Sequence, residues 1–105
     1  MVPAATSDLL ARWEAEGDFQ ADVPFAEFHA DGTWSGSDGC NGARGRWSMG
    51  EGGELLATSG ISTLMACDGV GAPGMVASAG RVGNVDGKLV LVDAAGVELG
   101  ALVRA

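Results

Sequence analysis

Turn dipeptides limit the fold of this chain more strongly than any other feature of its sequence. Asp31-Gly32, Asp38-Gly39, Asn41-Gly42 and Asp86-Gly87 separate segments of strand length. Such pairs favour the tight turns of β-hairpins, because glycine, and to a lesser degree Asp and Asn, tolerate positive φ. The chain has 18 glycines but only 3 prolines in 105 residues, which agrees with many tight turns and few stiff linkers. The pattern predicts a series of antiparallel strands.

The segments between the turns show the alternation of strands. In 24–30, an apolar face with Ala26 and Phe28 alternates with a polar face formed by Glu27 and His29. The expected strands are 9–13 (or a single helical turn there), 24–30, 33–36, 43–49, 54–59, 81–85, 88–93 and 97–104.

One helix is expected at 72–81, where Pro73 fits the first turn and Met75, Val76 and Ala79 would share a face. Seven or eight short strands with one short helix indicate a mainly β (α+β) fold, which we expect to be a small antiparallel β-barrel-like domain. A second hydrophobic core would not fit in this length, so 1–105 is expected to be a single domain. We expect 1–8 to be a flexible N-terminal tail.

The charge balance argues against nucleic acid as a partner. Fourteen acidic and six basic side chains give a net charge of −8, and such a surface repels phosphates and anionic lipid. The basic residues are scattered along the sequence and form no contiguous run: Arg12, Arg44, Arg46, Arg81, Lys88 and Arg104.

The sequence leaves the compartment open. The apolar run 89–92 is far shorter than the roughly 20 residues that cross a bilayer, so we expect no membrane insertion. The N-terminus lacks the basic and apolar regions of a signal peptide. The chain is therefore either cytoplasmic or the mature domain of a longer exported protein.

Cys40 and Cys67 are the two cysteines, and several interpretations of them stay open. A disulfide is favoured, since closing a loop of about 28 residues would stabilise the fold by roughly 3–4 kcal/mol in an oxidising compartment. Two separate buried thiols are the main alternative. A zinc site normally takes four Cys or His ligands, whereas the chain has two cysteines and one histidine. A thiol enzyme would need His29 as the base for Cys40, but His29 fits an outward strand position.

Other candidate residues have simpler structural interpretations. Trp13, Trp34 and Trp47 are expected in the core, with a ligand-facing role for Trp34 and Trp47 as the alternative. The acidic residues of 14–22 lack calcium-loop spacing and are expected to be solvated: Glu14, Glu16, Asp18 and Asp22. No activating arrangement accompanies the hydroxyl residues Ser59, Ser62 and Thr63, which are expected to cap turns.

Two cysteine-containing motifs resemble those of the META domain family, which is also described as HslJ-like. The first is Gly36-Ser37-Asp38-Gly39-Cys40-Asn41, and the second is Ser62-Thr63-Leu64-Met65-Ala66-Cys67. The resemblance covers about residues 9–104, and its motif positions are Gly36, Gly39, Asn41, Thr63 and Met65. Leu64 stands where the family commonly has a basic residue, so a role for that charge does not carry over.

The resemblance implies a small β-barrel-like fold with one helix, in which Cys40 and Cys67 lie close together. META domains are accessory modules of bacterial envelope proteins, often secreted or lipid-anchored, with no generally established catalytic activity. We therefore expect a non-catalytic, extracytoplasmic binding or stability module without cofactor or metal. It would be monomeric and would bind a protein or a small apolar ligand. A cysteine-dependent enzyme or redox protein that uses Cys40 is the alternative.

Overall fold

The computed structural model describes residues 2–17, 23–38, 42–62 and 72–105, with the backbone alone for 59–62. The described strands are β1 (Val2–Pro3), β2 (Arg12–Glu14), β3 (Phe25–Phe28), β4 (Thr33–Ser37), β5 (Gly42–Met49), β6 (Leu55–Ser62), β7 (Arg81–Val85), β8 (Lys88–Val92) and β9 (Glu98–Arg104). The helices are α1 (Thr6–Leu9), α2 (Ala72–Ser78) and a 3₁₀ turn, η1 (Glu51–Gly53). The expected helix at 72–81 is thus present as α2.

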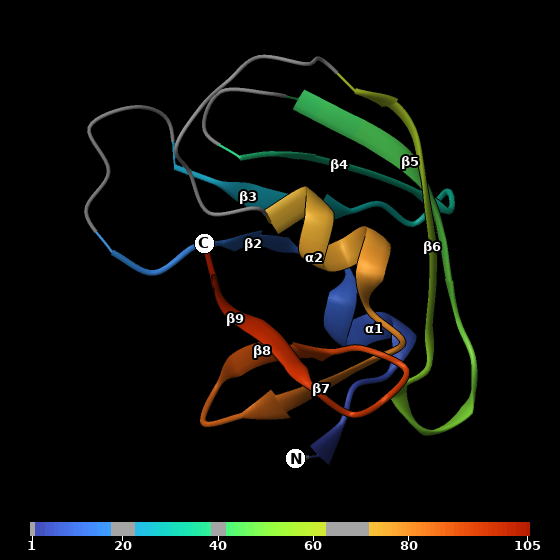
Figure 1. Cartoon of the computed structure of the whole chain (residues 1–105), viewed down its shortest axis with the longest axis vertical. Coiled ribbons are helices and arrows are strands. Elements are labelled where there is room, and N and C mark those ends of the chain that lie inside the picture. The colour runs from blue at the N-terminus through green and yellow to red at the C-terminus, as the bar shows by residue number, and fades with distance from the viewer. Residues whose placement is uncertain (1, 18–22, 39–41, 63–71) are drawn as a thin grey trace.

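The strands form one antiparallel sheet in the order β1-β7-β8-β9-β2-β3-β4-β5-β6, which curves around α2 (Figure 1). The β6 end of the sheet approaches β7, next to the other end, where Glu54 forms an isolated bridge with Arg81 and the Leu55 amide donates to the Gly80 carbonyl at 3.0 Å. Beyond this corner the described sheet is not closed. The antiparallel β prediction is confirmed, with nine described strands rather than seven or eight, but a closed barrel is not confirmed.

The turns follow the sequence pattern. Asp86 and Gly87 have φ values of 53° and 81° between β7 and β8, as a two-residue hairpin turn of the primed type requires. Gly32 has a φ of 85° between β3 and β4, where the Asp31 carboxylate accepts hydrogen bonds from the Thr33 amide at 2.9 Å and the Thr33 hydroxyl at 2.6 Å. These bonds lower the pKa of Asp31, because they favour its charged form.

The N-terminal residues depart from the expected tail. β1 pairs with β7, Ala4 is buried, and α1 begins with the Ala5 amide bonded to the Asp8 carboxylate at 2.8 Å. The ambiguous segment 9–13 contains the end of α1 and then the start of β2, so both the helical turn and the strand are present in part. Fully buried Leu9 anchors this region to the core.

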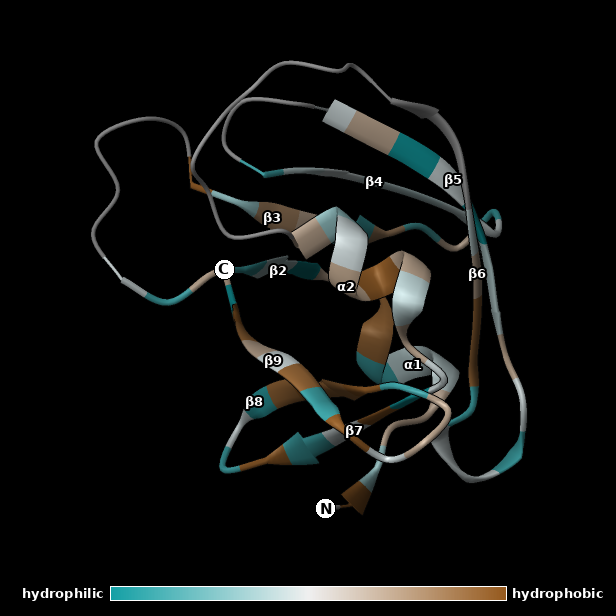
Figure 2. Ribbon diagram, in the orientation of Figure 1, coloured by the Kyte–Doolittle hydropathy of each residue, from teal (hydrophilic) through white to brown (hydrophobic). Residues whose placement is uncertain are grey.

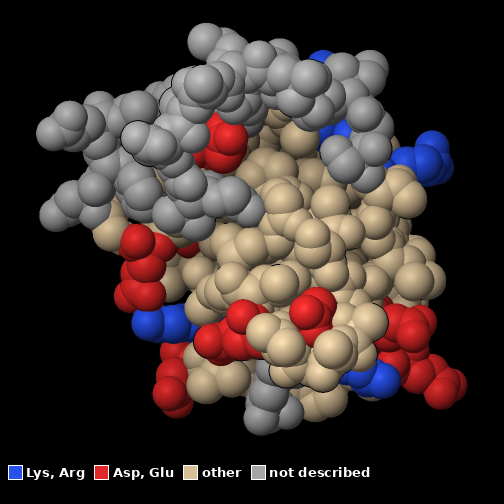
Figure 3. Space-filling model, viewed as in Figure 1, with Lys and Arg blue, Asp and Glu red and all other residues tan. Residues whose placement is uncertain are grey.

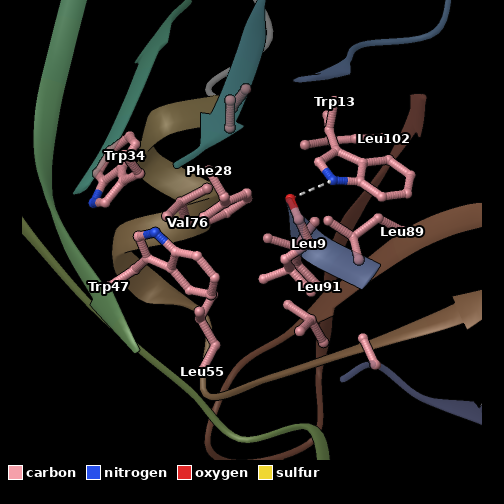
Figure 4. Packing of buried hydrophobic residues seen from close by; sticks show 14 of the residues in the cluster. Leu9, Trp13, Phe28, Trp34, Trp47, Leu55, Val76, Leu89, Leu91 and Leu102 are labelled. Carbon is pink, nitrogen blue, oxygen red and sulfur yellow. Dashed lines mark hydrogen bonds between the residues drawn. The ribbon is translucent and has the colours of Figure 1, made fainter. Parts of the chain in front are cut away.

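Tryptophans fill much of the core (Figure 4). Trp13, Trp34 and Trp47 are 3%, 1% and 7% exposed, which confirms their placement in the core. Each indole donates to a backbone carbonyl: Trp13 to Leu9 at 3.3 Å, Trp34 to Thr58 at 2.9 Å and Trp47 to His29 at 3.0 Å. Buried indoles need such acceptors, so the tryptophans join packing to backbone hydrogen bonding.

α2 lies against the inner face of the sheet and contacts β3, β4, β6 and β9. Its Val76 is fully buried, and its Met75 sulfur lies where a side chain on Gly100 would be. Because Met75 occupies this space, the Gly100 and Leu102 face of β9 points inward, and Leu102 is fully buried. The strands differ in hydropathy: β8 and β9 carry more apolar colour than β4 and β5 (Figure 2).

Candidate functional site

The motif residues divide between described and undescribed segments. Gly36 lies in β4, where a Cβ would come within 2.6 Å of the Phe25 carbonyl oxygen and 3.3 Å of Pro73 on α2. Glycine is therefore required there by close packing rather than by chemistry. The remaining motif and cysteine positions lie outside the described residues: Gly39, Cys40, Asn41, Thr63, Met65 and Cys67. The disulfide stays a prediction.

Trp34 and Trp47, for which a ligand-facing role is the alternative to a core position, are both buried. Trp34 is closed off by its contacts and by its bond to Thr58. Trp47 packs edge-to-face on Phe28 with ring centroids 5.2 Å apart, and it also contributes to the floor of a surface depression next to Arg46. Stacking of a ligand between the two indoles is inconsistent with this burial.

A polar surface lies on the opposite face of the same strands, and we call it the outer face. Since side chains alternate along a strand, inward Ala26 and Phe28 place Glu27 outward on β3. The register then aligns Glu27 with Ser35 on β4, and Ser35 with Arg44 on β5. The next row aligns Thr33 with Arg46 on β5, and Arg46 with Thr58 on β6.

Three side chains of the outer face, Glu27, His29 and Ser35, are linked by polar contacts, and we call them the polar chain. His29 shares a hydrogen bond of 3.2 Å between its Nε2 and the Ser35 Oγ, and its Nδ1 lies 3.6 Å from the Glu27 carboxylate. The His29 amide donates to the Thr33 carbonyl at 2.9 Å, which closes the turn and sets this arrangement. From the sequence, Cys40 is the only partner considered for His29. The Asp31-Gly32 dipeptide predicts a hairpin, and the register of that hairpin places Ser35 opposite Glu27.

An acid–imidazole–hydroxyl chain is the side-chain order of acyl-transfer enzymes, but the surroundings of Ser35 differ from theirs. Acyl transfer also needs backbone amides or other donors aimed at the developing oxyanion. Ser35 lies in the middle of β4, which is paired on both sides, so the amides around it are used by the sheet. Within the described residues, Glu27, His29 and Ser35 are therefore a connected set of polar side chains without an evident oxyanion site.

Arg44 and Arg46 are basic residues of the outer face whose side chains lack charged partners among the described residues. Three other basic residues have partners: Arg12 binds Glu14 at 3.0 Å and covers the Phe25 ring, Lys88 binds Glu16 at 2.8 Å, and Arg81 donates to the Gly52 carbonyl at 3.0 Å. Arg104 on β9 has no such side-chain partner among the described residues. The bond to Glu16 also raises the pKa of Lys88. Arg44 and Arg46 are exposed, and within the described parts of the chain neither guanidinium has an ion-pair or hydrogen-bond partner.

These two arginines form a local basic site on an acidic protein. They are two positions apart on β5 and project to the same side, so these two of the scattered basic residues lie together in the fold. In Figure 3, several basic side chains lie at the upper right, on the side of β5 and β6, whereas most acidic side chains lie at the left and below, where they are interspersed with other basic side chains. The chain has a net charge of −8, so these two arginines form a local positive site that can attract an anionic group.

A depression of about 560 Å³ adjoins Arg46 and is lined by Arg46, Trp47, Ser48, Leu56 and Thr58 among others. Leu56 is 57% exposed and lies opposite Ser48 on the neighbouring strand. A second depression of about 460 Å³ lies beside His29 and Leu10. The first one combines cationic and apolar surface, and is the stronger candidate for a binding site.

The described residues lack the clustered ligands of a metal centre. They contain no group of three or more His, Cys, Asp or Glu side chains that could hold a metal ion. Among the helices in these same parts of the chain, none has the length and apolar character needed to cross a membrane.

Comparison with known proteins gave one match. A family model described as META domain matches residues 6–74. The curated proteins and the solved structures that were compared gave no match. The matched region runs from α1 into the first residues of α2 and includes the whole outer face of β3 to β6.

Proposed function

The chain belongs to the META domain family, and from that premise we propose that it is a non-catalytic binding module of a bacterial envelope or secreted protein. It binds a protein partner on the outer face of β5 and β6, at Arg44, Arg46 and Leu56.

The filled interior supports binding on the outside. The space enclosed by the sheet is occupied by tryptophans and by Val76 of α2, all 7% exposed or less. A small apolar ligand would have to displace this core. The unpartnered arginines and the exposed Leu56, by contrast, can be covered without disturbing any contact among the described residues. This pairing of free cations with apolar surface is the observation that carries the proposal.

The polar chain of the outer face supports a non-catalytic role. Among the described residues, β3 and β5 pair with β4 on both sides of Ser35 and leave no evident amide for an oxyanion, and the His29 and Glu27 side chains are 38% and 36% exposed to water. The polar chain is therefore better suited to hydrogen bonding with a partner than to bond cleavage.

The Cys40–Cys67 disulfide belongs to the same proposal, since in an oxidising compartment it would link the residues that follow β4 in the sequence to those that precede α2. Alkylation of the unreduced protein followed by intact-mass measurement tests it. We expect no label without reductant and two labels after reduction. Label on Cys40 without reductant would instead favour the cysteine-dependent enzyme or redox protein.

Site-specific photo-crosslinking tests the binding face. A photoreactive residue is placed at Leu56 or, as a matched control, at Val97, because the two side chains are 57% and 59% exposed. With envelope and secreted fractions of the source bacterium, we expect a discrete protein adduct from position 56 that excess unlabelled protein competes away. Equal adducts from both positions, or none from position 56, would contradict the proposal.

A further inference from the structure

We infer that the outer face of β5 recognises an acidic peptide in extended conformation, with Arg44 and Arg46 each binding one carboxylate and Leu56 contacting an aliphatic side chain. This inference rests on the proposed function, because it names the partner class for the same face. Three features support it: spacing, charge and the position of the apolar surface.

The spacing of the arginines matches an extended peptide. Residues two apart on one strand face are separated by about 6.6 Å, and Arg44 and Arg46 have this relation on β5. Alternate residues of an extended peptide repeat at the same distance and also project to one side. Carboxylates on adjacent residues would project to opposite sides, so they could not engage both arginines.

The charge pattern favours a short acidic segment over a long polyanion. Guanidinium groups bind carboxylates through paired hydrogen bonds, and Arg44 and Arg46 have no such partner among the described residues. A long polyanion would extend over the rest of a surface with fourteen acidic residues and be repelled there. A short peptide contacts the basic site alone.

The exposed Leu56 adds a third position to the peptide pattern that the two arginines would recognise. Along the outer face of β5, Ser48 follows Arg46, and Leu56 lies opposite Ser48 on β6. A peptide residue two positions beyond the second carboxylate would therefore lie over Leu56 and the adjoining depression. The preferred ligand has the pattern acidic–any–acidic–any–aliphatic.

Two isomeric peptides test this pattern. The probe Leu-Thr-Glu-Thr-Glu-Thr-Leu is palindromic and can bind in either chain direction, and Leu-Thr-Thr-Glu-Glu-Thr-Leu has the same composition with adjacent glutamates. Fluorescence anisotropy with labelled peptides compares the wild type with Arg44→Gln, Arg46→Gln and, as a control for charge alone, Arg104→Gln, since Arg104 is also exposed.

We expect the alternating peptide to bind about three- to tenfold more tightly than its isomer, and each substitution on β5 to weaken it by a similar factor, as for solvent-exposed charged hydrogen bonds. Arg104→Gln should leave binding unchanged. Equal binding of the two isomers, or an equal loss in Arg104→Gln, would overturn the inference in favour of general charge attraction. Tighter binding of a single-stranded oligonucleotide that depends on the same arginines would overturn it in favour of a polyanion site.

The crosslinking experiment separates failure of this inference from failure of the proposed function. No binding of either peptide together with a competed adduct at position 56 would overturn only the acidic-peptide assignment. Loss of both results would overturn the proposed function as well.

Discussion

The inner and outer faces of β4 and β5 are built from alternating residues of the same two strands, yet they are constrained very differently. Inner-face Trp34, Gly36 and Gly45 are fixed by close contacts and a backbone hydrogen bond. Outer-face Arg44 and Arg46 have no ion-pair partner among the described residues. The comparison indicates that packing specifies one face and leaves the other available for binding.

The inner face depends on an irregular register between β5 and β6. The pairing shifts between Ala43 and Gly45, and the Thr58 carbonyl lies directly over Gly45, where it accepts the hydrogen bond from Trp34. A Cβ on Gly45 would lie 1.7 Å from the Thr58 oxygen. Gly45 therefore leaves the space for the Thr58 carbonyl, and Trp34 supplies its hydrogen-bond donor.

The largest expected effect comes from Gly45→Ala. The added methyl would displace the backbone of β6 and break the bond from Trp34, so we expect a loss of about 3 kcal/mol or more in the free energy of unfolding. Gly74→Ala in α2 is the matched control, because nothing lies within 4 Å of its Cβ position. That control should be neutral or stabilising by up to about 1 kcal/mol, as for glycine replacement in a helix. Urea denaturation measures both, and equal effects would contradict the assigned role of Gly45.

Trp34→Phe should have the second-largest effect. Phenylalanine keeps most of the apolar contacts but leaves the Thr58 carbonyl without its donor, and it vacates part of the core. We expect a loss of about 2 kcal/mol by the same measurement. A loss below about 0.5 kcal/mol would mean that water or another donor replaces the indole, and that the inner face is less constrained than we infer.

The sequence predicted those elements that are determined by local chemistry. The β7–β8 hairpin and the turn at Asp31-Gly32 follow from residues that permit positive φ, and α2 follows from its apolar spacing. The inward face of β9 was not predictable in this way. Gly100 and Leu102 point inward because Met75 of α2 packs over Gly100, and such a contact between distant segments has no local signal.

The candidate site was predicted only in part for the same reason. Alternation placed Glu27 and His29 together, but joining them to Ser35 and Arg44 required the register across the β3–β4 and β4–β5 turns. The absence of partners for Arg44 and Arg46 among the described residues depends on where every acidic side chain lies. The family motifs, in turn, identify Gly36 and the cysteines and give no information on the outer face.

A smaller, pH-dependent effect is expected at the turn that joins the two strands of the polar chain. Hydrogen bonds from Thr33 lower the pKa of Asp31 in the folded protein below its ordinary value of 3.8. Because the folded pKa is the lower one, the charged carboxylate stabilises the fold above the unfolded pKa, and this contribution is lost as pH falls through the folded pKa. Asp31→Asn should therefore melt below the wild type at neutral pH, and the gap should close in acid. A gap that does not change with pH would mean that the hydrogen bonds, not the charge, matter.

The smallest effect on stability, and the sharpest contrast with Gly45→Ala, is expected for the double variant Arg44→Gln and Arg46→Gln. Both side chains are exposed and unpartnered among the described residues, so the free energy of unfolding should change by no more than about 0.5 kcal/mol. The same variant should lose binding of the alternating acidic peptide. A variant that is as destabilised as Gly45→Ala would show that the arginines serve the fold. In that case the two faces would be equally constrained, and the outer face would lose its distinction as the part left for a partner.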